Sequence, residues 1–215
     1  MNRIAVFPNG AFQTNCYIIT TDEGAALIDA PSPASRIIRR LEEENLELRW
    51  IYLTHGHFDH VMALSALKER YKDVRIAISA ADASYLDPAV CRRDLSFFSM
   101  HDDKDITFPS ADLLLRDGNV TDIGLTVIET PGHTEGSICL YSEKDKVLFS
   151  GDTLFASGVG RTDMPGGSWS ALQSSLRRLF SIVRDGSVQV LPGHGMITTI
   201  EEERKGNPFL PQLDQ

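Results

Sequence analysis

Four short apolar runs of this sequence each end in a turn that carries histidine or aspartate. The runs are "RWIYLT", "LTVIET", "KVLFSGD" and "VQVLPGHG", and each leads into or contains a glycine-bearing turn. Runs of this length bounded by glycine and proline are typical of buried strands. Rigid scaffolds present reactive side chains where such strands end, so the pattern predicts a sheet-based fold with a polar site at its strand ends.

The first run leads into the densest polar cluster, "HGHFDH", which holds three of the six histidines. A single histidine usually serves only in hydrogen bonding, and Asp59 by itself would be a helix cap. Imidazole nitrogens and carboxylate oxygens are, however, the usual zinc ligands in proteins. His55 and His57 face the same way in an extended segment and could hold one ion, while Asp59 and His60 at the turn into a helix suit a second ion.

The other three runs each end on one candidate ligand. These are His133 after "VIETP", Asp152 after "VLFSG" and His194 after "VLPG". His101 is the one histidine outside these turns, and we expect it at the surface. Seven candidate ligands are too many for one tetrahedral ion and suit two ions that share a carboxylate.

The spacing of apolar residues predicts three longer helices. They cover "SPASRIIRRLEEEN", opened by Ser32 or Ser35, then "HVMALSALKERY" directly after the cluster, and "SWSALQSSLRRLFSIV" with a serine near its start. Residues 80–110 are expected to form short helices and loops. No linker-like stretch divides the sequence, so residues 1–215 are predicted to form a single domain.

Charge and composition limit the partners. The net charge of −9 and the pI near 5.1 argue against duplex nucleic acid, whose phosphates need a cationic surface. No apolar run approaches the roughly 20 residues of a membrane span, and the N-terminus does not resemble a signal peptide. Three widely spaced cysteines are typical of thiols in a reducing compartment. We therefore expect a cytoplasmic protein with a small-molecule partner and neither a membrane nor a nucleic acid partner.

The order and spacing of the seven candidate ligands resemble the metallo-β-lactamase superfamily of hydrolases. The resemblance runs from about "NCYIIT" to "NPFL", and it implies an α+β fold, an αββα sandwich of two mixed β-sheets flanked by helices. "TPGHTEGS", "FSGDTLF" and "LPGHG" resemble the glyoxalase II (hydroxyacylglutathione hydrolase) group, and "GVGRTDMPGG" resembles its compact bacterial branch. Because few residues follow His194, we expect no C-terminal helical domain of the kind that full-length glyoxalase II enzymes carry.

The resemblance also implies how the ligands divide between two divalent metal ions. The first ion would be held by His55, His57 and His133, the second by Asp59, His60 and His194, with Asp152 shared between them. Zinc is the expected metal, with iron and manganese as alternatives. A metal-bound hydroxide would cleave a thioester, such as S-D-lactoylglutathione or a related hydroxyacyl thioester, to an acid and a thiol. Asp59 would be mainly a ligand, with orientation of the hydroxide as a second catalytic role.

Two functional alternatives stay open. Persulfide dioxygenases resemble the chain in the first-ion ligands and in "GRTD", and would hold one iron through His55, His133 and Asp152. A lactonase is the second alternative, because the same hydroxide attacks esters. The absence of cysteine from the ligand segments argues against β-lactam hydrolysis.

Residues beside the ligands have two interpretations each. Arg161 could bind a substrate carboxylate, since guanidinium matches that group, or it could pair internally with Asp163. Thr54, Thr130 and Thr153 neighbour the ligands and could orient the imidazoles, or they could make ordinary turn hydrogen bonds.

Overall fold

The computed structural model of the chain describes residues 3–97 and 107–210, so His101 lies outside the described residues. The chain forms two compact units, Met1–Leu114 and Leu115–Gln215. The expectation of a single domain across residues 1–215 stays a prediction.

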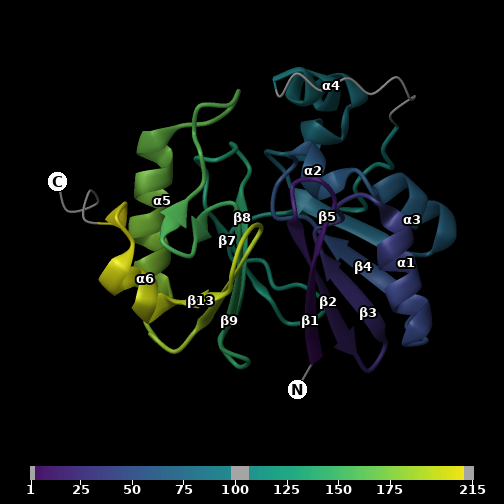
Figure 1. The fold of residues 1–215 in the computed structure, drawn as a ribbon, viewed down its shortest axis with the longest axis horizontal. Helices are drawn as coiled ribbons and strands as arrows, with labels where there is room; N and C mark the ends of the chain where they lie inside the picture. The colour runs from purple at the N-terminus through teal and green to yellow at the C-terminus, as the bar shows by residue number, and fades with distance from the viewer. Residues whose placement is uncertain (1–2, 98–106, 211–215) are drawn as a thin grey trace. The chain divides into compact units, whose positions relative to one another are not determined.

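The first unit is built on a six-stranded mixed sheet (Figure 1). The strands, in sheet order, are β1 (Arg3–Asn9), β2 (Thr14–Thr21), β3 (Gly24–Ile28), β4 (Leu48–Tyr52), β5 (Arg75–Ser79) and β6 (Leu113–Leu115). The strands β1, β2 and β3 pair antiparallel with their neighbours, whereas β3, β4 and β5 pair in parallel.

The helices of this unit are α1 (Ala34–Glu43), α2 (Phe58–Val61), α3 (Leu64–Arg70), the 3-10 helix η1 (Ala83–Leu86) and α4 (Pro88–Phe97). All but α4 bury apolar side chains in one core with the sheet, whereas Cys91 and Leu95 of α4 form a separate cluster with Phe58. Ile37 and Leu41 of α1 pack in the same buried cluster as Leu27 and Ile51 of the strands. Burial of such side chains contributes about 1.5–3 kcal/mol each, which is the main force holding the helices to the sheet.

The start of α1 differs from the sequence prediction. The helix begins at Ala34, and Pro33 occupies its N-cap with an extended backbone and no side-chain hydrogen bond. Ser32 lies one residue before the cap, and Ser35 lies inside the first turn, so neither serine caps the helix. The prediction of a serine cap was therefore wrong.

The helix predicted over "HVMALSALKERY" is divided into α2 and α3. The Ala63 N–H donates to the Ala30 carbonyl oxygen at 2.9 Å, and the Ala30 N–H donates to the His60 carbonyl oxygen at 2.8 Å. These two bonds tie the segment to the loop that follows β3. They replace helical bonds at the junction, which fixes the backbone beside His60.

The second unit is built on a five-stranded mixed sheet and a two-stranded hairpin. The sheet strands are β7 (Thr126–Glu129), β8 (Ile138–Ser142), β9 (Val147–Gly151), β12 (Gln189–Pro192) and β13 (Thr198–Thr199). Strands β9 and β12 pair in parallel, and the other pairs of this sheet are antiparallel. The hairpin strands are β10 (Leu154–Phe155) and β11 (Gly158–Val159).

Two helices cover this second sheet, α5 (Trp169–Ile182) and α6 (Ile200–Gly206). Leu172, Leu176 and Leu179 of α5 are buried in one cluster with strand residues. The predicted serine start is confirmed, because Ser168 caps α5 and accepts a hydrogen bond from the Ala171 N–H.

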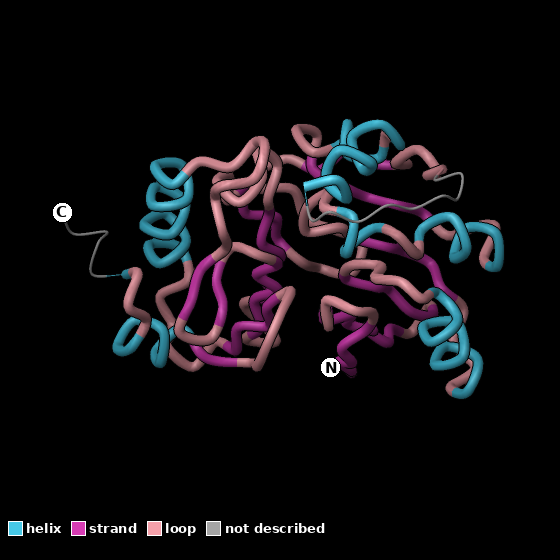
Figure 2. Tube along the Cα trace, turned by 45° about the horizontal axis from the view of Figure 1, so that its top comes forward, coloured by secondary structure: helices cyan, strands magenta, loops and turns pink. Residues whose placement is uncertain are grey.

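Each unit thus combines a mixed sheet with helices that pack against it, and Figure 2 shows strands and helices in contrasting colours. This agrees with the α+β class predicted from the sequence. Among the described residues, no helix has both the length and the apolar character needed to cross a membrane.

Candidate metal centre

The histidine cluster of the first unit follows directly after β4. His55, His57 and His60 are at most 3% exposed, which is unusual for three imidazoles so close in sequence. The ring centroid of His55 lies 4.9 Å from that of His57 and 4.1 Å from that of His60. The predicted convergence of these side chains is therefore present within the first unit.

Gly56 separates the first two histidines because a larger residue has no room there. A Cβ atom on Gly56 would overlap the side chain of Tyr85. The Gly56 N–H donates to Asp82 Oδ2 at 2.9 Å, and Asp82 is fully buried. Close packing on one side and a carboxylate on the other hold the backbone between His55 and His57.

A second buried carboxylate, Asp29, organises the other histidines. Asp29 Oδ2 lies 2.8 Å from His60 Nδ1, and Asp29 also accepts from the Thr54 N–H and the Thr54 hydroxyl, both at 2.8 Å. Because an ionised carboxylate only accepts, His60 carries its proton on Nδ1 and presents Nε2 as a lone-pair donor.

Thr54 links Asp29 to His55 and orients the His55 imidazole. Its hydroxyl gives its one proton to Asp29, so the oxygen accepts from His55 Nδ1, which lies 3.1 Å away. His55 then presents Nε2 in the same way as His60. The interpretation of Thr54 as an orienting residue is confirmed.

Asp59 is held by the hairpin that joins β1 to β2. The Thr14 hydroxyl donates to Asp59 Oδ2 at 2.8 Å, and the same oxygen lies 3.6 Å from His60 Nε2. Asp59 thus connects the histidine cluster to this hairpin.

The candidate ligands of the second unit come from three separate turns. His133 follows β7, Asp152 follows β9 and His194 follows β12. Asp152 Oδ2 lies 3.5 Å from His133 Nε2 and also 3.5 Å from His194 Nε2. One carboxylate oxygen therefore stands between two imidazole nitrogens.

Arg161 orients His133 through its backbone. The Arg161 carbonyl oxygen lies 2.8 Å from His133 Nδ1, so Nδ1 carries the proton and Nε2 is presented toward Asp152. The Arg161 side chain makes a two-bond ion pair with Asp163, with Nε–Oδ1 at 2.7 Å and Nη2–Oδ2 at 2.8 Å. This hydrogen bonding from Arg161 lowers the pKa of the Asp163 carboxyl to about 2. The internal pair is thus present, and a substrate role for Arg161 stays a prediction.

Thr130 and Thr153 serve the turn structure of this unit. Their hydroxyl oxygens lie 2.8 Å apart, and Thr130 also lies 3.6 Å from the Cys139 sulfur. For these two threonines the structural alternative holds, because the hydrogen bonds that they form connect the loops rather than the imidazoles.

The separations between donor atoms fit divalent metal ions. Two atoms that bind one tetrahedral ion at about 2.0–2.2 Å lie roughly 3.3–3.6 Å apart. The pairs inside the two units have this separation: Asp59–His60 at 3.6 Å, and Asp152–His133 and Asp152–His194 at 3.5 Å each. Such distances are long for hydrogen bonds and match neighbouring ligands of one ion.

The sequence prediction missed the carboxylates that support the ligands. Asp29 closes the apolar run "AALIDA", so the strand-end pattern used for the ligands would have found it. Asp82 lies in a loop without such a pattern, and Thr14 is far from the cluster in sequence. Only the fold brings these two residues to the histidine segment.

Known proteins are similar to the chain over most of its length. The family described as "Metallo-beta-lactamase superfamily" matches residues 9–194. Hydroxyacylglutathione hydrolase GloC of Haemophilus influenzae is 38% identical over 217 residues, which is 96% of this chain and 97% of that protein.

Two solved structures support the same family. BLEG-1 B3 metallo-beta-lactamase has a TM-score of 0.86 at 35% identity, covering 97% of this chain and 99% of its own. TTHA1623, solved in a di-iron-bound form, has a TM-score of 0.84 at 32% identity, covering 96% and 100%. The predicted metallo-β-lactamase fold is confirmed.

Proposed function

Because the chain belongs to the metallo-β-lactamase superfamily and is one of its metallohydrolases, we propose that it is a binuclear enzyme that cleaves a thioester to a carboxylic acid and a thiol. One observation carries the binuclear part of this proposal. Asp152 Oδ2 lies at the same distance, 3.5 Å, from the coordinating nitrogens of His133 and His194. A carboxylate in that position suits a ligand shared by two ions.

The proposed ligand sets follow the division implied by the family resemblance. The first ion is assigned to His55, His57 and His133, the second to Asp59, His60 and His194, and Asp152 to both. Imidazole and carboxylate donors suit zinc, and also iron and manganese. The di-iron form of TTHA1623 supports two ions and makes iron a real alternative to zinc.

The residues of the chain prepare the site for hydrolysis. When bound, the two ions supply a water molecule of lowered pKa as the nucleophile and a Lewis acid for the carbonyl oxygen. Asp29 and the Arg161 carbonyl fix which nitrogen His60 and His133 present, so the imidazoles need no reorganisation. Asp59, held by Thr14, is placed to orient the attacking water as well as to serve as a ligand.

A hydroxyacyl thioester such as S-D-lactoylglutathione is the proposed substrate. The name and the 38% identity of GloC support this class. A thiolate is a good leaving group, so the reaction needs little help from a general acid. Water adds to the carbonyl carbon, the carbon–sulfur bond breaks, and the thiolate takes a proton from solvent.

The test is hydrolysis of S-D-lactoylglutathione by zinc-loaded protein, followed by loss of thioester absorbance. We expect turnover that is lost on chelation of the metal and in Asp152→Ala. Asp122→Ala is the matched control, because it removes an exposed aspartate of the same unit. No turnover by protein that holds two ions would overturn the glutathione thioester as substrate.

Hydrolysis of a β-lactam is a second candidate, favoured by the 35% identity to BLEG-1 over nearly the whole chain. The same zinc-loaded protein tests it with a chromogenic cephalosporin. Cleavage of the cephalosporin with a higher kcat/KM than the thioester would make the lactam the preferred substrate.

A further inference from the structure

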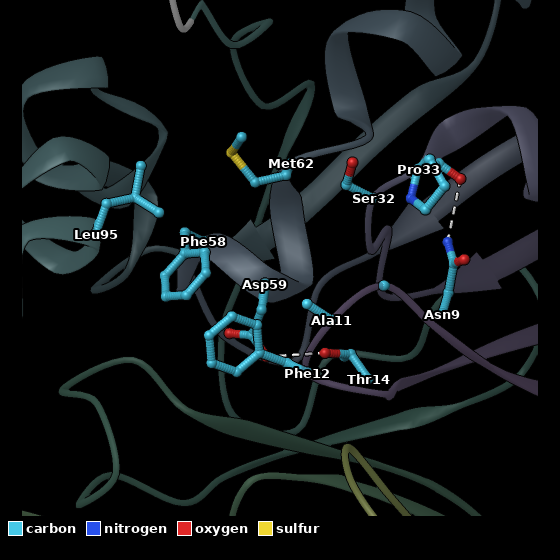
Figure 3. Close-up of a pocket in the computed structure, with 11 residues that line it drawn as sticks. Asn9, Ala11, Phe12, Thr14, Ser32, Pro33, Phe58, Asp59, Met62 and Leu95 are labelled. Atoms are coloured by element: carbon cyan, nitrogen blue, oxygen red, sulfur yellow. Dashed lines mark hydrogen bonds between the residues drawn. The ribbon is translucent and has the colours of Figure 1, made fainter. Parts of the chain in front are cut away.

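A cavity of about 320 Å³ lies within the first unit, between the β1–β2 hairpin and helices α2 and α4 (Figure 3). Its size is at the lower end of the roughly 300–1,000 Å³ range of small-molecule sites. Asp59 forms part of its wall. We propose that this cavity binds the acyl substituent of the thioester, and that it gives thioesters with larger and more apolar acyl groups a higher kcat/KM than S-D-lactoylglutathione. This inference rests on the proposed thioester hydrolysis.

The walls of the cavity are mainly apolar. Phe58 and Leu95 come from the two helices, Met62 directly follows α2, and Phe12 comes from the hairpin. The rings of Phe12 and Phe58 meet edge to face, with centroids 5.1 Å apart. Figure 3 shows these side chains gathered around Asp59. An aliphatic or aromatic group would bury apolar area against all four.

The charge of the walls excludes the thiol carrier as the occupant. Among the eleven described residues that line the cavity, Asp59 is the sole ionisable one, and none is lysine, arginine or histidine. The carboxylates of glutathione, or the phosphates of another carrier, would lose their hydration in this cavity without gaining an ion pair with any of these lining side chains. The neutral acyl side of a thioester has no such penalty.

The hairpin side of the cavity is held rigidly. Asn9 Nδ2 donates to the carbonyl oxygens of Pro31 at 2.8 Å and Pro33 at 3.1 Å. Gly10 has a φ of +73°, and a Cβ atom there would overlap the Ser32 carbonyl oxygen. The hairpin therefore packs directly against the loop between β3 and α1. A preformed wall lowers the entropy cost of binding, which is what a dedicated subsite requires.

Asp59 connects the cavity to the reacting group. It is a proposed metal ligand and a wall residue at once, and Thr14, also in the wall, holds it at 2.8 Å. A carbonyl carbon attacked beside Asp59 therefore has its substituent at the mouth of the cavity. The short, hydroxylated lactoyl group would leave most of the apolar wall uncovered.

A kinetic series tests the assignment with the thiol held constant. S-acetyl-, S-butanoyl- and S-hexanoylglutathione are compared with S-D-lactoylglutathione on the metal-loaded protein. We expect kcat/KM to rise by up to about 4-fold per added methylene, as burial of that group supplies. Phe12→Ser should lower the hexanoyl-to-acetyl ratio by about 5-fold through lost apolar contact. Phe209→Ser is the matched control, because Phe209 is 36% exposed and does not line the cavity.

A second measurement needs neither metal nor turnover. Metal-free protein labelled with [13C-methyl]methionine is titrated with hexanamide, a neutral probe, and with lactamide as the control. The Met62 signal, assigned by its loss in Met62→Leu, should shift and saturate with hexanamide only. Phe12→Ser should weaken that binding, and Phe209→Ser should not.

The outcomes separate this inference from the proposed function. Equal kcat/KM across the acyl series together with an unchanged Met62 signal would overturn the acyl subsite and leave thioester hydrolysis standing. Failure of metal-loaded protein to cleave every thioester would overturn the proposed function, and the acyl assignment with it. A rising series with a saturable Met62 shift supports both.

Discussion

The two units present their candidate ligands by different means. In the first unit, one six-residue segment carries the ligands, and the buried side chains of Asp29 and Asp82 hold it. In the second unit, three separate turns carry the ligands, and a backbone carbonyl holds His133. The His60 side chain is fully buried, whereas that of His194 is 29% exposed. The orientation of His60 in the first unit thus depends on a side chain that a substitution can remove, whereas that of His133 in the second unit depends on a backbone carbonyl.

The largest expected effect comes from removing one ligand in either unit. His55→Ala and Asp152→Ala should each lower kcat/KM by roughly 1,000-fold or more, because a bound metal ion stabilises the transition state by several kcal/mol. Both should also lower the metal content measured by atomic absorption. Full activity in either variant would break the assignment of that unit to the site.

Next in size is the loss of the carboxylate that supports the first unit. Asp29→Asn keeps the shape but replaces one of the two acceptor oxygens by an N–H donor, so the side chain can no longer accept from both His60 and the two Thr54 groups, and metal affinity should fall by about 10–100-fold. Competition with a chelator measures the affinity. Asp22→Asn, at an exposed aspartate, is the control, and an equal affinity in both variants would contradict the role of Asp29.

A smaller effect is expected at the hairpin. Thr14→Val removes the hydrogen bond to Asp59 without changing the size of the side chain. One such bond contributes about 0.5–1.5 kcal/mol, so metal affinity should fall by about 2–10-fold. A loss as large as that of Asp29→Asn would mean that the hairpin, and not the buried carboxylates, organises the first unit.

The corresponding change in the second unit should have little effect on metal. Arg161→Ala keeps the carbonyl that accepts from His133 and removes only the exposed pair with Asp163. Metal affinity should change by no more than about 5-fold, the limit for a surface ion pair. A raised KM with unchanged metal content would support the predicted substrate role of Arg161. A 10-fold loss of metal would contradict the backbone account.

The smallest effect on the site is expected from two of the three buried thiols, those of Cys16 and Cys139, which lie one in each sheet. Burial raises the pKa of Cys16, and it raises that of Cys139 to about 11 despite hydrogen bonds from Thr130 and Thr153. Neither thiol should react with Ellman's reagent at pH 8 in the native protein, and both should react in denaturant. The protonated thiol of Cys139 favours the folded state below its ordinary pKa. That contribution to the free energy of unfolding is lost as the pH rises toward 11, which urea unfolding at pH 8 and pH 10.5 would detect.

The sequence predicted the strand ends well, because each apolar run is followed by a turn in which glycine stands next to a histidine or an aspartate. It predicted the start of α5 from a serine cap and failed at α1, where Pro33 takes the cap position. It missed the break between α2 and α3, because that break depends on backbone hydrogen bonds to Ala30, which follows β3 and is distant in sequence. Local patterns locate ligands, whereas the residues that support them are brought in by long-range contacts.

The proposed ligand sets, in which His60 and His194 hold the same ion, are tested most directly by a metal count on the double variant. Wild-type protein should retain close to two ions per chain after dialysis, which would also disfavour the mononuclear iron alternative. His60→Ala and His194→Ala should each retain about one ion. If both residues bind the second ion, the double variant should still retain about one, with circular dichroism as the control for folding. Independent losses, leaving a double variant with no metal beside single variants with one ion each, would contradict the shared site.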